Sequence, residues 1–552
     1  MKSKKVLALM AAMLMGATTL SGCDVGGTKV ENNNYDETKA NLSVATFDGG
    51  VGRAWLEEAA KRFEKKYENA THFQEGRTGV KVSVDGDKNK YSGNKLAESG
   101  SLNKDVYFTE AVDYYEFVNK GLVADVTDVI TGSMSTYGES GTIEDKIDVA
   151  IKDFMKAKDD KYYMFPFYDG FYGFTYDIDL FENEGFYFDK EGDFIGINDA
   201  GFATNKSNGP DGEAGTYDDG LPATYEQMIQ LCDQIVAKGC VPFCYSGNYP
   251  DYVNRSFYGY AADYEGYDSF MVNNTFKGTI EVVKSITEDG SLMGNVEVET
   301  VTITRDNGYE VQRQAGKYYA LKMQEILFGG VDYIGGTHNG LDYTVAQGEF
   351  IKSTYTAKPY AMLAEGVWWE NEATPTFVEI ENLRGVKKSD RRFGFMPVPK
   401  ASEEMAGPQT LFSVNESFGF INKNAENMEL AKEFMRFLHT DEEMSKFSAK
   451  TSIPRSLQYD VTEADKATAT PYGKYLIEMR SQSKVVYAYS SCDFVINHAA
   501  NFDNGVWYGT ATVAGKNLNN AFNAFKDDKA TAKDFFDGLL AYQKSGWSAN
   551  SK

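Results

Sequence analysis

The sequence has few of the residues that usually hold structural metals. Its 552 residues include five cysteines and four histidines, and the histidines are far apart along the chain. Cys232, Cys240 and Cys244 form a cluster, but no two cysteines stand in a CxxC pair. Because structural zinc sites usually need such pairs, or Cys with nearby His, the pattern argues against zinc. Whether these three residues and Cys492 form disulfides is left open, since an extracellular compartment permits them.

Several catalytic motifs are also missing. No GxxxxGK[ST] loop is present, because Gly515-Lys516, the nearest match, is followed by Asn517, so the chain carries no ATPase of its own. Neither GxSxG nor HExxH occurs. Carboxylates are too numerous to exclude the spatially paired acids of a glycosidase. A carbohydrate-active enzyme therefore stays open as an alternative to a non-catalytic binding protein.

Positive charge is scarce. The chain has 56 basic and 81 acidic residues, and removal of residues 1–22 takes away three lysines and no acid, which leaves a net charge of −28. Such a charge argues against nucleic acid as a partner. The preferred interpretation is a solvated acidic surface; attraction of a cationic solute is the alternative.

Only the N-terminus suggests a targeting segment. Lys2, Lys4 and Lys5 precede an apolar run, Val6–Leu20, that is too short to span a bilayer comfortably. We therefore expect residues 1–22 to be a signal peptide. The junction Leu20-Ser-Gly-Cys23 resembles a lipobox, which predicts Cys23 as the lipidated N-terminus; a chance cysteine near an ordinary cleavage site is the alternative. Residues 23–40 are polar and predict a flexible tether.

Aromatic residues are abundant, at 14% of the chain, with 36 Tyr and 36 Phe. They are densest in residues 165–179, Phe-Pro-Phe-Tyr-Asp-Gly-Phe-Tyr-Gly-Phe-Thr-Tyr-Asp-Ile-Asp. Pro166 favours extended backbone before it, and Gly170 and Gly173 permit angles or close contacts that a side chain forbids. This stretch predicts a strand that carries a hinge.

Periodicity around this stretch predicts alternating strands and helices. Strands are expected at Leu42–Phe47, Lys81–Val84, Val106–Thr109 and Val241–Tyr245, and helices over residues 55–67, 113–118, 224–238, 430–438 and 535–542. Thr224 with Gln227 forms a capping-box pair before the third helix, which is expected to end at Gly239. Val485–Ser491 and residues 501–508 are predicted to be aromatic-rich loops. These elements indicate an α/β fold.

Residues 181–220 are rich in Gly, Asp and Asn and predict an insertion of hairpin and loop. Within them, Asn208, Asp211, Glu213, Asp218 and Asp219 could supply oxygen ligands to a structural Ca²⁺. The spacing is not that of an EF-hand, and turns use the same residue types, so a simple loop is the alternative. No cofactor is required by the sequence.

Four segments in order resemble a known family. They are residues 165–179, Ala361-Met-Leu-Ala-Glu-Gly-Val-Trp-Trp369, Arg392-Phe-Gly-Phe-Met-Pro-Val-Pro399 and residues 413–454. Together they resemble the carbohydrate-type (family 1) extracellular solute-binding proteins of bacterial ABC transporters. The resemblance implies a two-lobe, class II periplasmic-binding-protein-like fold with hinge crossovers and insertions. The expected lobes are residues 41–166 plus 421–455 and residues 174–414 plus 460–552.

The resemblance also implies a function. We expect a monomeric, non-enzymatic lipoprotein on the extracellular face of the cell membrane that captures a sugar or oligosaccharide and delivers it to ABC permease subunits. Trp and Tyr rings suit the apolar faces of sugars, and carboxylates suit their hydroxyl pairs. A cationic solute or a peptide is the alternative ligand.

Candidate ligand-binding residues come from strand-end positions and from the resemblance. They lie after strands, on the predicted hinge and in the Trp pair: Asp48, Glu110, Tyr168, Asp169, Tyr172, Tyr245, Asn248, Trp368, Trp369, Arg455 and Trp507. Only one of Trp368 and Trp369 is expected to stack on ligand, because neighbours on an extended segment point to opposite faces.

Overall fold

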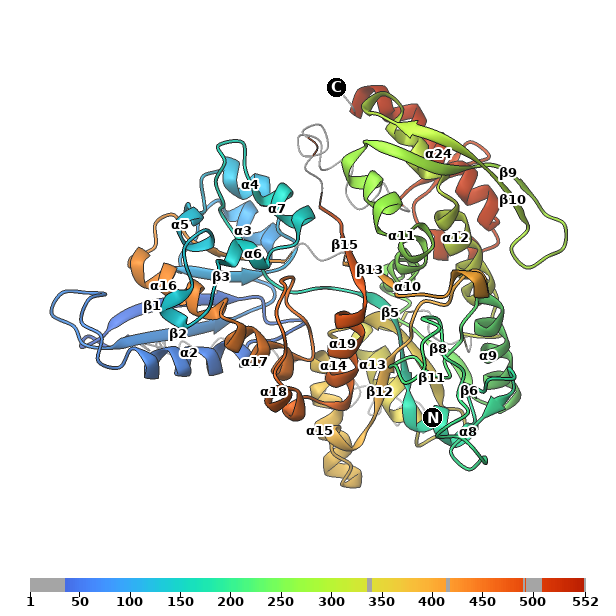
Figure 1. Cartoon of the computed structure of the whole chain (residues 1–552), viewed down its shortest axis with the longest axis horizontal. Coiled ribbons are helices and arrows are strands. Elements are labelled where there is room, and N and C mark those ends of the chain that lie inside the picture. Colours follow the sequence, from blue (N-terminus) through green and yellow to red (C-terminus); the bar gives the residue numbers. More distant parts are fainter. Residues whose placement is uncertain (1–34, 335–339, 414–416, 490–491, 493–508, 551–552) are drawn as a thin grey trace, which may run out of the picture.

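A computed structural model describes residues 35–334, 340–413, 417–489, 492 and 509–550. Two mixed sheets organise it, one on the left of Figure 1 and one on the right. The first sheet has the order β2-β1-β3-β14-β4, in which β1, β2 and β3 are parallel and β14 and β4 run antiparallel to their neighbours. Its strands are β1 (Ala40–Thr46), β2 (Val80–Gly86), β3 (Val106–Thr109), β4 (Phe165–Pro166) and β14 (Phe418–Ile421).

The second sheet has the order β12-β5-β11-β8. Its strands are β5 (Tyr172–Asp177), β8 (Val241–Cys244), β11 (Tyr360–Gly366) and β12 (Phe393–Phe395). β11 is parallel to β8 and antiparallel to β5. Gly173 of β5 needs to be glycine because a Cβ atom there would lie 2.4 Å from the ring of Phe395. The predicted α/β class is confirmed.

The aromatic stretch connects the two sheets, since it contains β4 of the first sheet and β5 of the second. Two other segments cross between the sheets: the second crossing segment contains Ser417 and the third contains Pro454. The Phe167 amide donates to the Ser417 carbonyl over 3.1 Å, and the Asp169 amide donates to the Pro454 carbonyl over 3.0 Å. Three crossing segments therefore lie side by side between the sheets, as the resemblance implied.

Helices flank the sheets on both sides. The helices around the first sheet are α2 (Ala54–Lys66), α3 (Gly93–Ser99), α4 (Tyr114–Asn119), α5 (Thr127–Ile130), α6 (Ile143–Lys146), α7 (Val149–Met155), α16 (Met428–Leu438) and α17 (Asp441–Thr451). Around the second lie α8 (Ile178–Glu184), α9 (Tyr225–Ala237), α10 (Asp251–Ser256), α11 (Tyr258–Thr275), α12 (Ala315–Phe328), α13 (Tyr343–Ser353), α14 (Trp369–Glu372), α15 (Thr374–Arg384), α18 (Glu463–Thr468), α19 (Pro471–Gln482), α23 (Ala521–Lys526) and α24 (Ala532–Asn550).

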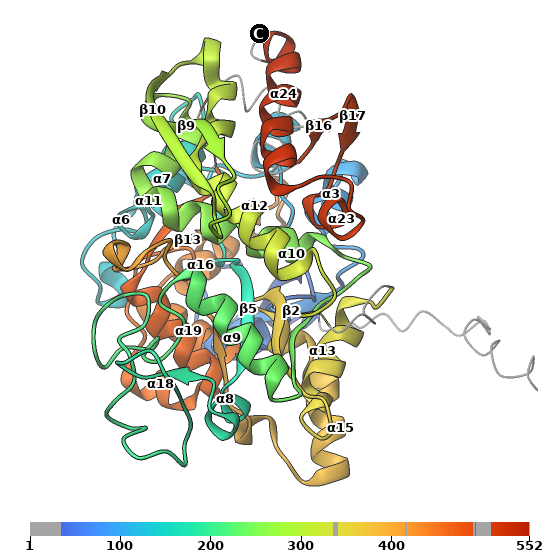
Figure 2. The same cartoon turned by 90° about the vertical axis from the view of Figure 1, so that its right-hand side faces the viewer.

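Short strand pairs complete the fold. They are β6 (Tyr187–Phe188) with β7 (Phe194–Ile195), β9 (Gly278–Thr287) with β10 (Asn295–Ile303), β13 (Thr410–Ser413) with β15 (Lys484–Tyr487), and β16 (Ala511–Val513) with β17 (Lys516–Leu518). Figure 2 shows the β9–β10 hairpin and the C-terminal part of α24 at one end of the molecule and α15 at the other.

Most predicted elements appear within two to four residues of their expected bounds. The N-cap of α9 forms as expected, because the Thr224 hydroxyl accepts from the Gln227 backbone amide. The Gln227 side chain, however, accepts from the backbone amide of Ala223 and not from that of Thr224. The loop predicted at Val485–Ser491 is wrong in its first half, since β15 pairs in parallel with β13 there. Residues 1–34, which hold the predicted signal peptide and most of the tether, lie outside the described residues.

The core crosses the expected lobe boundary. One continuous cluster of buried side chains includes Val44 and Phe108 beside the first sheet together with Leu363 and Phe393 of the second. The proposed lobe division of residues 41–166 plus 421–455 against 174–414 plus 460–552 therefore stays a prediction. In the described part of the chain, no helix is both long and apolar enough to cross a membrane, and the four cysteines there are free thiols.

Candidate functional site

Two acidic residues lie where strands of the first sheet end. β1 and β3 are parallel, with Thr46 opposite Phe108, so their carboxyl ends share one edge. Asp48 follows β1 by two residues, and Glu110 follows β3 directly. Asp48 is partly exposed and lies 3.7 Å from the guanidinium of Arg53. The predicted placement of both acids at this edge is confirmed.

Trp368 occupies the corresponding end of β11. Its indole meets the ring of Tyr172 edge to face, with centroids 5.0 Å apart. Gly366 makes this possible: a Cβ atom there would lie 2.4 Å from the indole ring, so only glycine lets the indole lie against the backbone. A glycine two residues before Trp368 is thus required for steric reasons.

Both indoles of the Trp pair are buried, with Trp368 6% and Trp369 0% exposed, so stacking of one of them on ligand stays a prediction, and the extended backbone on which it was based is wrong. The backbone at Trp368 is helical, with φ −83° and ψ −6°, and α14 begins at Trp369. The two indoles therefore project from a helical backbone and not from an extended one. Trp369 is fully buried and packs against Phe350, Phe393 and other core rings.

The two sheets meet at these strand ends. The Gly50 amide, beyond β1, donates to a carboxylate oxygen of Glu372 on α14 over 3.3 Å. The Tyr168 hydroxyl donates to Glu110. We call Asp48, Glu110, Tyr168, Tyr172, Trp368 and Glu372 the strand-end site. Nearby, Lys88 reaches across to the Tyr343 hydroxyl over 3.1 Å.

Burial controls the electrostatics of the strand-end site. Desolvation raises the pKa of Glu110 to about 7, against an opposing hydrogen bond from Tyr168. Desolvation also raises the pKa of Glu372, and that of Glu365 rises well above its ordinary value through burial and the nearby Glu372. Carboxyl groups here are thus held toward the neutral, proton-donating form.

Two cations of the chain lie against aromatic rings in this region. The Arg255 guanidinium is 5.4 Å from the centroid of Tyr172 and donates to its hydroxyl over 3.3 Å. The Lys88 ammonium is 5.8 Å from the centroid of Tyr343. These contacts occupy ring faces that a cationic solute would otherwise use.

Asp169 and Arg455 were both predicted to contact ligand, and both form polar contacts with other buried residues. Asp169 is fully buried and pairs with Arg480 of α19 over 2.8 Å. Arg455 is also buried and donates to the His439 imidazole over 2.9 Å and to the Pro166 carbonyl over 3.2 Å. Their contacts join the crossing segments to one another, and a ligand contact by either residue stays a prediction.

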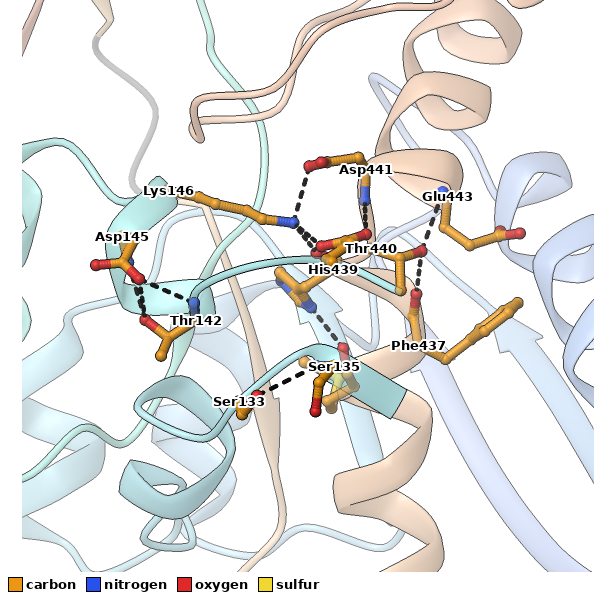
Figure 3. A network of polar contacts seen from close by, with 12 residues as sticks. Ser133, Ser135, Thr142, Asp145, Lys146, Phe437, His439, Thr440, Asp441 and Glu443 are labelled. Atoms are coloured by element: carbon orange, nitrogen blue, oxygen red, sulfur yellow. Dashed lines mark hydrogen bonds and ion pairs between the residues drawn. The ribbon is translucent and has the colours of Figure 1, made fainter. Parts of the chain in front are cut away.

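His439 lies at the junction of α16 and α17, shown in Figure 3. Its Nδ1 is 2.6 Å from the Met435 carbonyl, so Nδ1 carries the proton and Nε2 accepts from Arg455. Lys146 of α6 ties the same junction to the helices beside the first sheet, through Asp441 at 2.8 Å and the His439 carbonyl at 3.1 Å. Burial and the Arg455 charge hold the pKa of His439 well below its usual range.

The remaining candidates are dispersed. Tyr245 is a core side chain that packs on Phe522 and Phe328, with centroids 5.3 and 6.1 Å away. Asn248 is exposed on the loop after β8 and donates its backbone amide to the Leu341 carbonyl. Trp507 lies outside the described residues.

The side chains of the predicted calcium loop bond mostly within the loop, although Oδ1 of Asp219 is buried without a hydrogen-bond partner. Asp218 is buried and accepts from the Thr216 hydroxyl and the Asp211 amide, while Asp211 accepts from the Glu213 amide. Asp219 accepts from the Gly215 amide, and the Asn208 side chain donates to the Gly212 carbonyl. Over the residues that the structure describes, no group of three or more His, Cys, Asp or Glu side chains could hold a metal ion. The calcium prediction thus gains no support.

A cavity of about 1010 Å³ lies elsewhere, beside the third crossing segment and α19. Its lining is mostly polar and includes Tyr267, Arg455, Tyr459, Lys466 and Arg480. None of the strand-end site residues lines it. Size alone would favour this cavity, but the strand-end site is the place where the carboxyl ends of parallel strands from both sheets converge, which is where open α/β sheets bind ligands.

Sequence reasoning missed four residues here: Gln347, Glu365, Glu372 and Arg255. Glu365 could have been found from the sequence, because it lies in the segment 361–369 that carried the resemblance, and Glu372 follows that segment by three residues. Gln347 on α13 and Arg255 on α10 had no local signal, since only the packing of these helices on β11 and β5 brings them close.

Two mixed sheets joined by three crossing segments, with polar and aromatic groups at facing strand ends, define an α/β binding protein. The chain matches the profile of the bacterial extracellular solute-binding proteins over residues 58–474. It therefore belongs to that family, whose members are binding proteins. No curated protein sequence is significantly similar to the chain.

Solved structures agree on the fold. The solute-binding protein RafE in complex with raffinose has a TM-score of 0.53 and 14% identity, covering 93% of this chain and 100% of that one. The apo form of RafE from Streptococcus pneumoniae gives 0.52 and 14%, with coverages of 94% and 100%. The cyclic alpha-maltosyl-1,6-maltose binding protein from Arthrobacter globiformis gives 0.52 and 12%, with coverages of 93% and 100%. The two-lobe solute-binding fold is thus confirmed.

Proposed function

We propose that this extracellular solute-binding protein captures a sugar or oligosaccharide at the strand-end site and delivers it to an ABC importer. One observation carries the proposal: the Trp368 indole lies edge to face with Tyr172 beside carboxyl groups contributed from both sheets, Glu110 and Glu372. Aromatic rings pack on the apolar faces of sugars, and carboxyl groups bond their hydroxyls. The raffinose and cyclic maltosyl-maltose proteins of similar fold are consistent with this ligand class.

A cationic solute is the weaker candidate. Arg255 and Lys88 already lie against Tyr172 and Tyr343, so an incoming ammonium would meet the chain's own positive charges. Burial also favours neutral carboxyl groups at Glu110 and Glu365, which lowers their attraction for a cation.

The test is calorimetry with a panel of oligosaccharides, a polyamine and a peptide. We expect an oligosaccharide to bind, and Trp368→Ala to weaken its binding by about ten- to a hundredfold, because the stacking surface is lost. Tyr542→Ala changes a partly exposed ring on α24 and serves as the matched control. Equal binding by wild type and a folded Trp368→Ala variant would contradict the site, and binding of only the polyamine or peptide would contradict the ligand class.

The same incubations separate a binding protein from an enzyme. A binding protein returns the oligosaccharide intact, so no new reducing ends should appear after prolonged incubation. Their appearance would favour a surface-anchored carbohydrate-active enzyme.

We further propose that Cys23 anchors the chain by its acyl groups to the extracellular face of the membrane, next to the permease. The lipobox-like junction Leu20-Ser-Gly-Cys23 and the polar segment after it support this arrangement.

A further inference from the structure

Two buried oxygens beside the strand-end site have no hydrogen-bond partner in the described structure. They are Oε2 of Glu365, at the end of β11, and Oε1 of Gln347, on α13. Both side chains are fully buried. Buried polar atoms are nearly always hydrogen-bonded in folded proteins, so each unpaired oxygen needs an explanation.

The two side chains belong to a connected row. The Gln347 side-chain amide donates to Glu372 over 3.0 Å and lies 3.5 Å from the other oxygen of Glu365. Glu372 in turn accepts from the Gly50 amide beyond β1. The row therefore begins at the contact between the two sheets and ends at Glu365, so separation of Gly50 from Glu372 would uncover it.

Glu365 also adjoins the aromatic part of the strand-end site. Its charge acts on the ionisation of both Tyr172 and Tyr252. Tyr172 contacts Trp368 at 5.0 Å and Tyr252 at 5.5 Å between centroids. Glu365 is thus connected through Tyr172 to the indole on which the sugar ring is proposed to lie.

We propose that Glu365 and Gln347 together bind one hydroxyl group of the ligand and make that hydroxyl a requirement for tight binding. The inference rests on the proposed sugar-binding function and assigns specificity to residues at the buried end of the same site. A hydroxyl both donates and accepts, so it satisfies both unpaired oxygens at once.

Other groups of a ligand would satisfy only one of the two unpaired oxygens. Burial raises the pKa of Glu365 and so favours its protonated form, in which an Oε2–H group would need an acceptor, whereas Gln347 Oε1 needs a donor. An ammonium group has no lone pair for Glu365, and an acetal oxygen has no proton for Gln347. A hydroxyl group meets both needs.

The experiment uses the mature chain and calorimetry. Raffinose, maltotetraose, cellotetraose, xylotetraose and mannotetraose identify the sugar that binds most tightly, and a set of its monodeoxy forms follows. We expect one monodeoxy form to bind the wild type at least about tenfold more weakly than the others, because it leaves the buried polar pair unmatched.

Variants connect that hydroxyl to the two residues. The Gln347→Leu variant should bind this monodeoxy form almost as tightly as it binds the parent sugar. The difference from the wild type would show that the residue and the hydroxyl are coupled. Glu365→Gln should bind within about threefold of wild type, because a carboxamide also offers a donor and an acceptor. Gln324→Leu, a buried glutamine that donates to Asn254 in α10, is the matched control and should show no coupling.

The outcomes are distinguishable. No binding of any sugar by the folded wild type would overturn the proposed function and this inference together. Sugar binding with equal losses for every monodeoxy form, or with no coupling to Gln347→Leu, would overturn the inference alone and leave the row as an internal structural or water-filled contact. Should Gln347→Leu fail to fold, the wild-type monodeoxy series and Gln347→Met decide in the same way.

Discussion

At the scale of single residues, burial changes chemistry that the sequence presents as ordinary. Glu110 is one of 81 acidic residues, yet its position after β3 and beneath Tyr168 gives it a pKa of about 7. Asp169 has the same side-chain chemistry as Asp48, but one is enclosed with Arg480 and the other faces solvent near Arg53. The environment, and not the residue type, separates a solvent-exposed acid from a buried structural one.

Glu110 should make stability depend on pH. In the unfolded chain this carboxyl loses its proton near 4.5, and in the folded chain near 7, so between these values the folded state binds more protons. The free energy of unfolding should therefore fall as pH rises through this window, by up to about 3 kcal/mol, since one unit is worth about 1.4 kcal/mol.

Glu110→Gln removes this dependence. Chemical denaturation at pH 4.5 and pH 8 should show the variant gaining stability over wild type only at the higher pH. Glu98→Gln, an exposed glutamate on α3, is the control for a general charge effect. A constant difference between Glu110→Gln and wild type at both pH values would contradict the buried position.

At the scale of elements, one ion pair and one charge-assisted hydrogen bond hold the crossing segments in place. The Asp169–Arg480 pair joins the aromatic stretch to α19, and the Arg455–His439 contact joins the third crossing segment to the α16–α17 junction. Both lie among buried residues, where removal of one partner leaves an uncompensated polar group.

Arg480→Met should therefore destabilise the chain by about 3–5 kcal/mol, because Asp169 would remain buried without its cation. The double variant Asp169→Asn with Arg480→Met should recover most of that loss, since the buried charge is gone. Urea denaturation of the wild type, the single variant and the double variant measures the loss and its recovery. A loss below about 1 kcal/mol in the single variant would show that Asp169 reaches solvent or another partner.

At the scale of the whole molecule, polar contacts at the strand-end site join the parts of the chain that surround the two sheets. Gly50 to Glu372 and Lys88 to Tyr343 connect them across the strand-end site. Single hydrogen bonds contribute about 0.5–1.5 kcal/mol, so their loss should change the balance between open and closed arrangements by up to about tenfold.

Small-angle X-ray scattering should detect this balance. Tyr343→Phe removes the acceptor for Lys88 and should increase the radius of gyration without ligand, while saturation with the best oligosaccharide should restore a value close to that of the wild type. An identical profile for both proteins, with and without ligand, would argue against closure about the crossing segments.

Anchoring is also a property of the whole molecule. Cys23→Ala removes the residue that would carry the acyl chains, and we expect the variant to leave the membrane fraction and appear in the medium. Immunoblots of both fractions, with Cys492→Ala as a cysteine control, measure the release. Retention of Cys23→Ala at the level of the wild type would show that the cysteine at the junction is incidental.

The sequence alone determined the local elements and the class. Strands at β1 and β3, the helix capped by Thr224 and the aromatic stretch all follow from short-range patterns, because periodicity, capping and glycine act within a few residues. The order of four motifs then led to the family. The position of Glu110 after β3 was predicted for the same reason, because a strand end is a local feature, whereas the Trp pair came from the resemblance and its backbone is helical and not extended.

Only the tertiary structure decided which of these residues meet. Gln347 and Arg255 join the strand-end site because α13 and α10 pack on β11 and β5, contacts that join residues far apart in the chain. Asp169 and Arg455 are buried because Arg480 and His439, which are distant from them in the sequence, pair with them in the fold. Burial and long-range pairing depend on how the whole chain packs, and no short stretch of sequence carries that information.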